Sequence, residues 1–279
     1  MTERQRDKWE IISMPTKRSQ QNAEASRASV NPPNRKGTLY VVAVSIGHPD
    51  DVTVRAIRVL AEVDIIASED PSMTQQLLMH HSIQATVTSY GPRNLREKAA
   101  VLLQRLQQGT DVAFVSDCGS PLVADPGDFL VTAAHAHGIP VVPIPGPSAI
   151  IAALTAAGFS CDSFYFLGHL SGSTSHIAQC LLDSLRRKGP TIAFCTGTRV
   201  ARILKTLDGI APRCSVAVAY DLTKPNERII RGTACEVRER LRPARGQEVT
   251  LVLGKDGDRW DDQGGRRAQS LASRRIKTR

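Results

Sequence analysis

The sequence has few cysteines, and none of them lie close together. Six cysteines occur singly among 279 residues, and no C-x-x-C spacing is present. Zinc sites and disulfide frameworks both need cysteines in regular sets, so this pattern argues against either. We therefore expect reduced thiols, no metal site and a cytoplasmic protein.

Long apolar runs are also missing. No stretch approaches the ~20 consecutive apolar residues of a membrane-spanning helix, and the N-terminal residues are polar rather than arranged as a secretory leader. We expect neither a membrane partner nor a signal peptide. The hydrophobic content of 41% still suits a globular protein with two domains of ordinary size.

Several common catalytic and cofactor-binding patterns are not present. Gly47 follows the first expected strand without the further glycines of G-x-G-x-x-G, which argues against an ordinary Rossmann dinucleotide site. Ser120 and Ser148 lack the G-x-S-x-G surroundings of a hydrolase nucleophile. The histidine pairs at 80–81 and 135–137 have no acid or cysteine that completes a metal-ligand set, so we expect them on the surface.

Positive charge is concentrated at the two ends of the chain. The formal net charge is +9, and residues 1–37 and 255–279 each hold eight basic against four acidic residues. Both segments are polar and poor in aromatic and periodic apolar residues, so we expect two basic, disordered arms. Such arms are compatible with salt-sensitive binding to RNA phosphates, and equally with simple solvation.

Between the arms, strand patterns alternate with helix patterns. Strands are expected at 38–44, 64–68, 112–115, 141–144, 164–167, 191–195, 215–220 and 248–253, and helices at 52–63, 95–108, 128–137, 147–157, 175–188, 198–207 and 235–241. The alternation predicts an α/β protein with two αβα domains, 38–160 and 161–254, and a ligand cleft between them. The boundary is expected near residue 160 because small polar residues cluster there and the periodicity lapses.

Two loops rich in glycine and proline follow short strands, at 111–127 and 143–149. In the first, an apolar run ends at Ser116, and glycines and prolines then prevent a regular element. In the second, a strand ends in Pro145-Gly-Pro147, which opens directly into a helix. Because open α/β sheets bind ligands at the carboxyl ends of their strands, these loops are the expected ligand site.

A series of short motifs runs through residues 38–254. They are Leu39-Tyr-Val-Val-Ala, Ile46-Gly47, Glu69-Asp70, Ser116-Asp-Cys-Gly-Ser-Pro121, Asp125-Pro-Gly127, Pro143-Ile-Pro-Gly-Pro-Ser-Ala149, Phe166-Leu-Gly168, Leu222-Thr-Lys224 and Gly232-Thr233. In this order they resemble the tetrapyrrole methylase-like (class III) S-adenosylmethionine-dependent methyltransferases. Within that family the chain is most similar to the enzymes that 2'-O-methylate a cytidine of 16S rRNA in the small ribosomal subunit.

The resemblance implies a fold, a cofactor and an assembly. It implies two αβα domains with a cofactor cleft between them, a homodimer, and S-adenosyl-L-methionine held largely by main-chain groups. The residues that would contact the cofactor are Ile46, Gly119, Ser120, Pro121, Val123, Ser148, Ala149, Thr196 and Gly232. Glycine and proline suit this task because they present backbone N–H and C=O groups at fixed angles.

Methyl transfer to a ribose hydroxyl also requires a group that removes the proton. Among the residues that match the family, Asp117 and Lys224 are the candidates near the reacting centre, and Asp70 is expected on the acceptor side. A second interpretation of Asp117 is that it only binds the N–H groups of its own loop, as aspartate commonly does.

Departures from the family pattern concentrate where an acceptor would bind. They are Ser45-Ile-Gly-His48, Glu69-Asp-Pro-Ser72, Ser89-Tyr-Gly-Pro-Arg-Asn94, Phe194-Cys-Thr-Gly-Thr-Arg199 and Asp221-Leu-Thr-Lys224. Three hypotheses therefore stay open. The chain is an rRNA ribose methyltransferase, a divergent member that methylates a small molecule such as a tetrapyrrole, or a binding protein that kept the fold without catalysis.

Six arginines help to distinguish these hypotheses. They are Arg93, Arg96, Arg199, Arg202, Arg228 and Arg231. An RNA acceptor requires positive charge around the mouth of the cleft, whereas a small acceptor does not.

Overall fold

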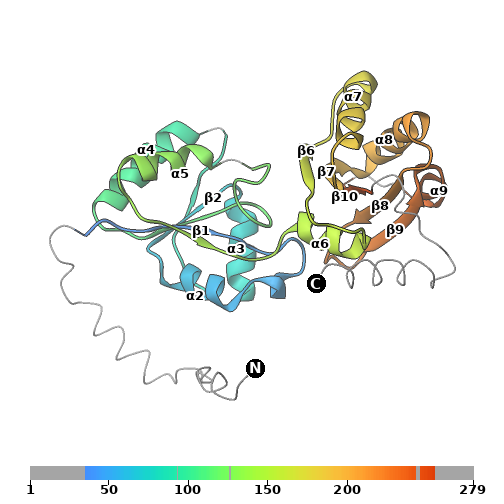
Figure 1. Ribbon diagram of the computed structural model, residues 1–279. Coiled ribbons are helices and arrows are strands. Elements are labelled where there is room, and N and C mark those ends of the chain that lie inside the picture. Colours follow the sequence, from blue (N-terminus) through green and yellow to red (C-terminus); the bar gives the residue numbers. More distant parts are fainter. Residues whose placement is uncertain (1–34, 93, 126, 243–245, 255–279) are drawn as a thin grey trace, which may run out of the picture.

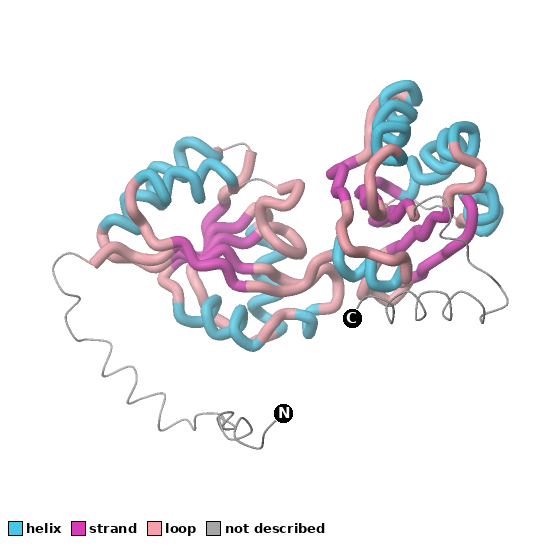
Figure 2. The backbone as a smooth tube through the Cα atoms, in the orientation of Figure 1, coloured by secondary structure: helices cyan, strands magenta, loops and turns pink. Residues whose placement is uncertain are grey.

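The computed structural model describes residues 35–92, 94–125, 127–242 and 246–254, and these residues form two α/β units (Figures 1 and 2). Most of the first predicted arm and all of the second lie outside the described residues. The last residues of the first arm make defined contacts: Lys36 donates a hydrogen bond to the carbonyl of His137 at 2.7 Å, and the Gly37 N–H donates to the carbonyl of Leu106 at 2.7 Å.

The first unit is built on a five-stranded parallel sheet of order β3-β2-β4-β1-β5. Its strands are β1 (Leu39–Val42), β2 (Ile65–Ser68), β3 (Val87–Ser89), β4 (Val112–Val115) and β5 (Val141–Ile144). All four residues of β4 are buried, as expected for the centre of a parallel sheet that is covered on both faces.

Helices cover both faces of this sheet, with α4 and α5 on one side and α2 and α3 on the other (Figure 1). Their bounds are α2 (Val54–Glu62), α3 (Pro71–His80), α4 (Leu95–Gln107) and α5 (Asp128–Ala136), and a 3-10 turn, η2 (Pro49–Asp51), precedes α2. Each helix buries its apolar stripe: Leu102 and Leu106 of α4, for example, pack against Phe114 of β4.

The second unit contains a mixed five-stranded sheet of order β6-β7-β10-β8-β9, in which β6 and β7 are parallel and the other pairs antiparallel. Its strands are β6 (Tyr165–His169), β7 (Thr191–Thr196), β8 (Ser215–Tyr220), β9 (Arg228–Thr233) and β10 (Glu248–Leu253), and its helices are α6 (Ala149–Ala157), α7 (Thr174–Leu185), α8 (Gly197–Ile210) and α9 (Ala234–Arg240). The predicted α/β class, with one helix-covered sheet in each unit, is confirmed.

Helix α6 covers the second sheet, on the face opposite to α7, α8 and α9 (Figure 1). Ile150 and Leu154 of α6 lie in one apolar cluster with Ile192 of β7. This helix therefore packs with the second unit although it precedes the boundary expected near residue 160. The domain limits themselves stay a prediction.

The structure corrects some local expectations. Helix α3 and strands β3 and β9 were not expected, because β3 has only three residues and β9 alternates arginines with apolar residues at a sheet edge. The helix expected at 52–63 begins at Val54 instead, because Thr53 caps α2 by accepting a hydrogen bond from the Ala56 N–H at 3.1 Å. Among the residues described, no helix has the length and apolar character needed to cross a bilayer.

Candidate functional site

A cavity of about 430 Å³, which we name the larger cavity, lies between the two units. The first unit contributes the loops that follow β1, β2, β4 and β5, and the second contributes β6, β7 and β10 with the residues before it. The volume falls within the range of small-molecule sites, ~300–1,000 Å³. The larger cavity thus lies at the strand ends where a ligand site was expected.

Main-chain hydrogen bonds fix the floor of the larger cavity. The Val44 N–H donates to the carbonyl of Gly119 at 2.9 Å, and the Gly119 N–H donates to the carbonyl of Ser45 at 3.2 Å. Gly119 has φ of +71°, and a Cβ built on it would lie 3.3 Å from Cγ2 of Ile46. Glycine at this position therefore allows the loops after β1 and β4 to pack closely and to leave backbone facing the cavity.

Three carboxylates of the first unit, Glu69, Asp117 and Asp125, line the larger cavity. Desolvation raises the pKa of each of them. The charge of Asp117 raises the pKa of Glu69 and of Asp125 further. This cluster of partly desolvated negative charge favours a positively charged ligand group.

The second unit provides an aromatic and apolar wall. Phe194 and His169 line the larger cavity, with ring centroids 5.5 Å apart, and Phe166 supports Phe194 from behind at 4.9 Å. Cys195 also lines the cavity, and burial raises the pKa of its thiol to about 12. The thiol is therefore neutral and unsuited to act as a nucleophile.

Most of the predicted cofactor residues lie together around the larger cavity. Those that line it are Ile46, Gly119, Ser120, Val123, Ser148, Ala149 and Thr196. Pro121 is buried in the same loop and does not line it. Gly232 lies in β9 opposite Val216, and Glu236 and Arg240 of α9 are its close neighbours instead.

The three predicted catalytic residues differ in their positions. Asp117 lines the larger cavity and accepts a hydrogen bond from the backbone of Asp70. The Asp70 side chain caps α3, accepting from the Ser72 N–H at 2.8 Å. Lys224 Nζ lies 2.9 Å from a carboxylate oxygen of Glu248, which itself lines the larger cavity.

A second cavity, of about 320 Å³, adjoins the first; we name it the smaller cavity. It is bounded by the end of β1 and its following loop, by α3, and by the end of β4. Asp117 lines both cavities. This cavity was not predicted, because α3, which forms one side of it, was not expected from the sequence.

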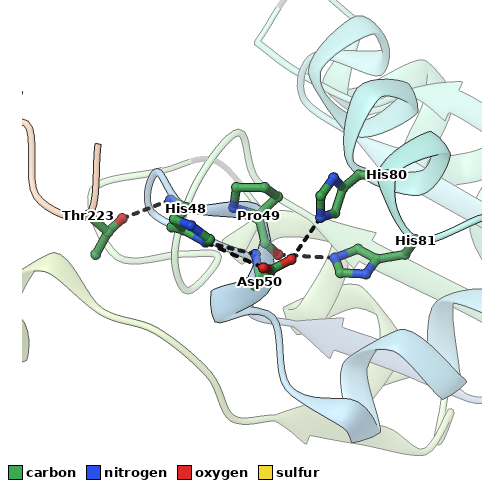
Figure 3. A network of polar contacts seen from close by, with 6 residues as sticks. All are labelled: His48, Pro49, Asp50, His80, His81 and Thr223. Atoms are coloured by element: carbon green, nitrogen blue, oxygen red, sulfur yellow. Dashed lines mark hydrogen bonds and ion pairs between the residues drawn. The ribbon is translucent and has the colours of Figure 1, made fainter. Parts of the chain in front are cut away.

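The two units meet closely where the loop after β1 contacts the loop after β8. The backbone N–H of His48 donates to Thr223 Oγ1 at 2.9 Å (Figure 3). Thr223 and Asp221 have positive φ values of 64° and 46°. The turn that carries Lys224 therefore contains two residues in a backbone conformation that is uncommon outside glycine. Glu227 stabilises this turn by accepting a hydrogen bond from the Thr223 N–H at 2.6 Å.

Of the six arginines that would distinguish an RNA acceptor from a small one, the five in the described residues line neither cavity. Arg199 is the nearest along the chain, since it lies in the first turn of α8, three residues after Thr196. Arg228 lies over the Tyr220 ring at 5.2 Å, and Arg202 donates to the carbonyl of Gly172 at 3.0 Å. Arg93 lies outside the described residues. Within the described part, this set does not favour an RNA acceptor over a small one.

Several residues that line the larger cavity were not predicted from the sequence. Glu69 and Asp125 belong to motifs that were noted, but no role was assigned to them. His169 and the segment 246–250 were not singled out, although His169 follows Phe166-Leu-Gly168 directly. Charged residues at strand ends were the signal that could have identified the two carboxylates. No group of three or more potential metal ligands is gathered in the described part of the chain.

Comparison with known proteins identifies a family and several relatives. Residues 38–238 match the family described as Tetrapyrrole (Corrin/Porphyrin) Methylases. Several curated relatives bear the name Ribosomal RNA small subunit methyltransferase I. The protein of Micromonospora olivasterospora is 37% identical over 246 residues, which cover 87% of this chain and 77% of the relative. That of Halalkalibacterium halodurans is 37% identical over 229 residues (82% and 79%), and that of Escherichia coli O157:H7 is 37% identical over 236 residues (82% and 82%).

Solved structures share the arrangement of two α/β units. Cobalt precorrin-4 methyltransferase, an enzyme of cobalamin biosynthesis, has a TM-score of 0.60 at 19% identity and covers 81% of this chain and 98% of its own. Uroporphyrin-III C-methyltransferase from Thermus thermophilus, in complex with S-adenosyl homocysteine, has a TM-score of 0.56 at 20% identity, with coverages of 78% and 97%. At these identities the likeness establishes the fold.

Proposed function

Because the chain belongs to the tetrapyrrole (corrin/porphyrin) methylase family and is an S-adenosylmethionine-dependent methyltransferase, we propose that its acceptor is the ribose 2'-hydroxyl of a cytidine in 16S rRNA. The observation that carries this proposal is the 37% identity to relatives named as methyltransferases of small-subunit rRNA, over at least 82% of the chain. The structurally similar enzymes that act on tetrapyrroles reach only 19–20%.

The larger cavity has the chemistry that S-adenosylmethionine requires. When bound, this cofactor supplies an electrophilic methyl group on a positively charged sulfur. Glu69, Asp117 and Asp125 offer negative charge to that sulfonium and to the ammonium group. The loop of Gly119 and Ser120 lines the same cavity, and the rings of Phe194 and His169 offer a stacking surface for adenine.

We assign the proton transfer to Asp117. Its carboxylate accepts the proton of the ribose hydroxyl while the hydroxyl oxygen forms a bond to the methyl carbon. Bound S-adenosylmethionine would supply the methyl group and would keep the electron pair of its carbon–sulfur bond, so the products would be a 2'-methyl ether and a neutral thioether. The raised pKa of Asp117 makes it a stronger base than an ordinary aspartate once it is ionised.

Lys224 and Asp70 receive supporting roles in this proposal. Lys224 is already ion-paired with Glu248 at the edge of the larger cavity, so we assign it to positioning rather than to proton removal. Asp70 holds the start of α3 and, through its backbone, the carboxylate of Asp117. Alignment of donor and acceptor is the main task of the protein in a methyl transfer of this kind.

The partners and location follow from the proposed acceptor. A small-subunit substrate places the reaction in the cytoplasm. The assembly into a homodimer remains a prediction of the family resemblance.

Methyl incorporation tests this proposal. The protein is incubated with S-adenosylmethionine labelled in its methyl group and with purified 30S subunits, free 16S rRNA or uroporphyrinogen III. We expect label in an RNA acceptor and none in the tetrapyrrole. Label in the tetrapyrrole alone would establish the second hypothesis. No label in any acceptor, together with no cofactor binding by calorimetry, would establish a binding protein.

A further inference from the structure

The smaller cavity is positioned to hold part of an acceptor. It opens at the carboxyl ends of β1 and β4, where parallel sheets bind ligands. Because Asp117 lines both cavities, a molecule in the smaller cavity and a molecule in the larger one meet at this carboxylate. Asp117 is also the residue to which we assign proton removal, so the reacting hydroxyl lies at the junction of the two spaces.

The lining of the smaller cavity combines apolar surface with a few polar groups. Leu77 and Met73 of α3 provide apolar contact, and Met73 as a residue is 50% accessible. Gln76 of the same helix adds an amide, which both donates and accepts hydrogen bonds. A flat, heteroaromatic ring matches this combination, because its faces are apolar and its edge is polar.

Polar contacts hold the loop that forms one wall of this cavity (Figure 3). His80 Nε2, on α3, lies 2.7 Å from Asp50 Oδ1, and the His81 ring nitrogen lies 3.0 Å from the carbonyl oxygen of Pro49. On the other side of the loop, His48 is hydrogen-bonded to Thr223 of the second unit. The wall is thus fixed both to α3 and to the turn that carries Lys224.

We propose that the smaller cavity receives the base of the acceptor nucleotide, turned out of the rRNA strand, so that its ribose lies at Asp117 facing the larger cavity. The inference rests on the proposed function and adds where the acceptor binds. A volume of about 320 Å³ accommodates one base with its sugar, whereas a four-ring tetrapyrrole macrocycle needs a larger space. Enzymes that modify a base within a duplex extrude the target nucleotide into such a pocket, which shows that a nucleotide turned out of its strand can be bound in this way.

Matched pairs of substitutions on α3 test the inference by activity. Gln76→Ala and Met73→Ala remove cavity groups, whereas Gln75→Ala and Met79→Ala change their exposed counterparts, which line neither cavity. We expect the KM for 30S subunits to rise about tenfold in each cavity variant, the loss of one good contact. The control variants should keep the wild-type KM, and all four should bind S-adenosyl homocysteine normally. Equal KM values within the pairs would overturn the inference while leaving the proposed function standing.

Methionine methyl NMR tests the same inference without activity. Cytidine 5'-monophosphate and ribose 5-phosphate are added in turn to the full-length protein saturated with S-adenosyl homocysteine. We expect cytidine 5'-monophosphate to shift the Met73 signal and not the Met79 signal, and ribose 5-phosphate to shift neither. A Met73 signal that does not move, or that moves equally with ribose 5-phosphate, would contradict a base-binding cavity. Failure of the proposed function appears separately, as wild-type protein that methylates no RNA.

Discussion

Gly47 and Thr223 belong to different units, and a Cβ built on Gly47 would lie only 2.6 Å from Thr223 Oγ1. The same Cβ would lie 2.7 Å from Cγ of Lys224. Such distances are shorter than any real carbon contact, so the absence of a side chain at Gly47 is what lets the two units touch here. The contact holds Lys224, and through it Glu248, against the larger cavity.

Substitution of Gly47 by alanine should therefore separate the units. We expect Gly47→Ala to lower both the melting temperature and the affinity for S-adenosyl homocysteine, because backbone and side-chain atoms of residues 222–224 must move. Differential scanning calorimetry and titration calorimetry measure the two effects. Gly209→Ala is the matched control: Gly209 lies in α8 with no atom near its Cβ position, so alanine should stabilise the protein by up to about 1 kcal/mol. Cofactor affinity equal in the two variants would argue against the contact.

Substitutions of Asp70 distinguish its contribution to stability from any contribution to the methylation rate. Its side chain caps α3 by accepting from the N–H groups of Ser72 and Met73 at 2.8 and 3.3 Å. Asp70→Ala should cost about 1 kcal/mol in the free energy of unfolding, whereas Asp70→Asn should cost little because asparagine caps equally well. Urea unfolding gives the stabilities and methylation assays give the rates. If Asp70→Asn is as unstable as Asp70→Ala, the cap is not the stabilising contact.

Asp117 should control the pH dependence of methyl transfer. Its pKa is raised by desolvation, so the fraction present as carboxylate, and with it kcat, should increase as pH rises through this raised pKa and then level off. Asp117→Asn should reduce kcat by about 10²–10⁴-fold and abolish the pH-dependent rise, while cofactor affinity falls much less. Rate measurements across the acid range decide this, and a variant that keeps the wild-type rise would assign the proton transfer to another group.

Because Glu69 belongs to the carboxylate cluster, we expect the free energy of unfolding to decrease as pH rises through the range in which Glu69 titrates. Desolvation raises the pKa of Glu69, so between its ordinary and its raised pKa the folded protein retains a proton that the unfolded chain has already lost. Stability therefore decreases as pH rises through this window, and Glu69→Gln should gain stability at neutral pH relative to wild type but not in acid.

Glu236 is expected to have the opposite effect on the pH dependence of stability from Glu69. Hydrogen bonds from the backbone and side chain of Thr233 lower the pKa of Glu236, so its contribution is present above its ordinary pKa and is lost as pH falls. Glu236→Ala should thus destabilise at neutral pH and converge with wild type in acid. Thermal unfolding of both variants at several pH values tests the pair of predictions; a loss of stability in Glu69→Gln at neutral pH would contradict the first.

The sequence predicted the fold and much of the larger cavity because both depend on local patterns. The buried run of β4 and the glycine and proline loop after it are visible in the sequence, and Gly119 and Ser120 indeed line the larger cavity. The alternation of strands and helices likewise indicated two α/β units. Local periodicity and turn chemistry suffice for such features.

The features that were not predicted from the sequence depend on contacts between segments that are far apart along the chain. No local pattern shows that Gly47 touches Thr223, that Asp117 lies between two cavities, or that Lys224 pairs with Glu248. Helix α3 escaped because its first turn is polar and its cap, Asp70, was interpreted only as a catalytic candidate. Gly232 matched a motif, yet its place in an edge strand beside α9 follows from the sheet order, which the sequence did not provide.

Nucleoside mass spectrometry of 16S rRNA shows directly whether this protein methylates a ribose of the RNA. Small subunits isolated without the modification are incubated with the protein and S-adenosylmethionine, and the digested rRNA is compared with the same rRNA treated with the Asp117→Asn variant. We expect one additional 2'-O-methylcytidine, at a single position resistant to alkaline cleavage, which the variant does not produce. Methylation of a base instead of a ribose, or rRNA without any new methyl group, would contradict this expectation.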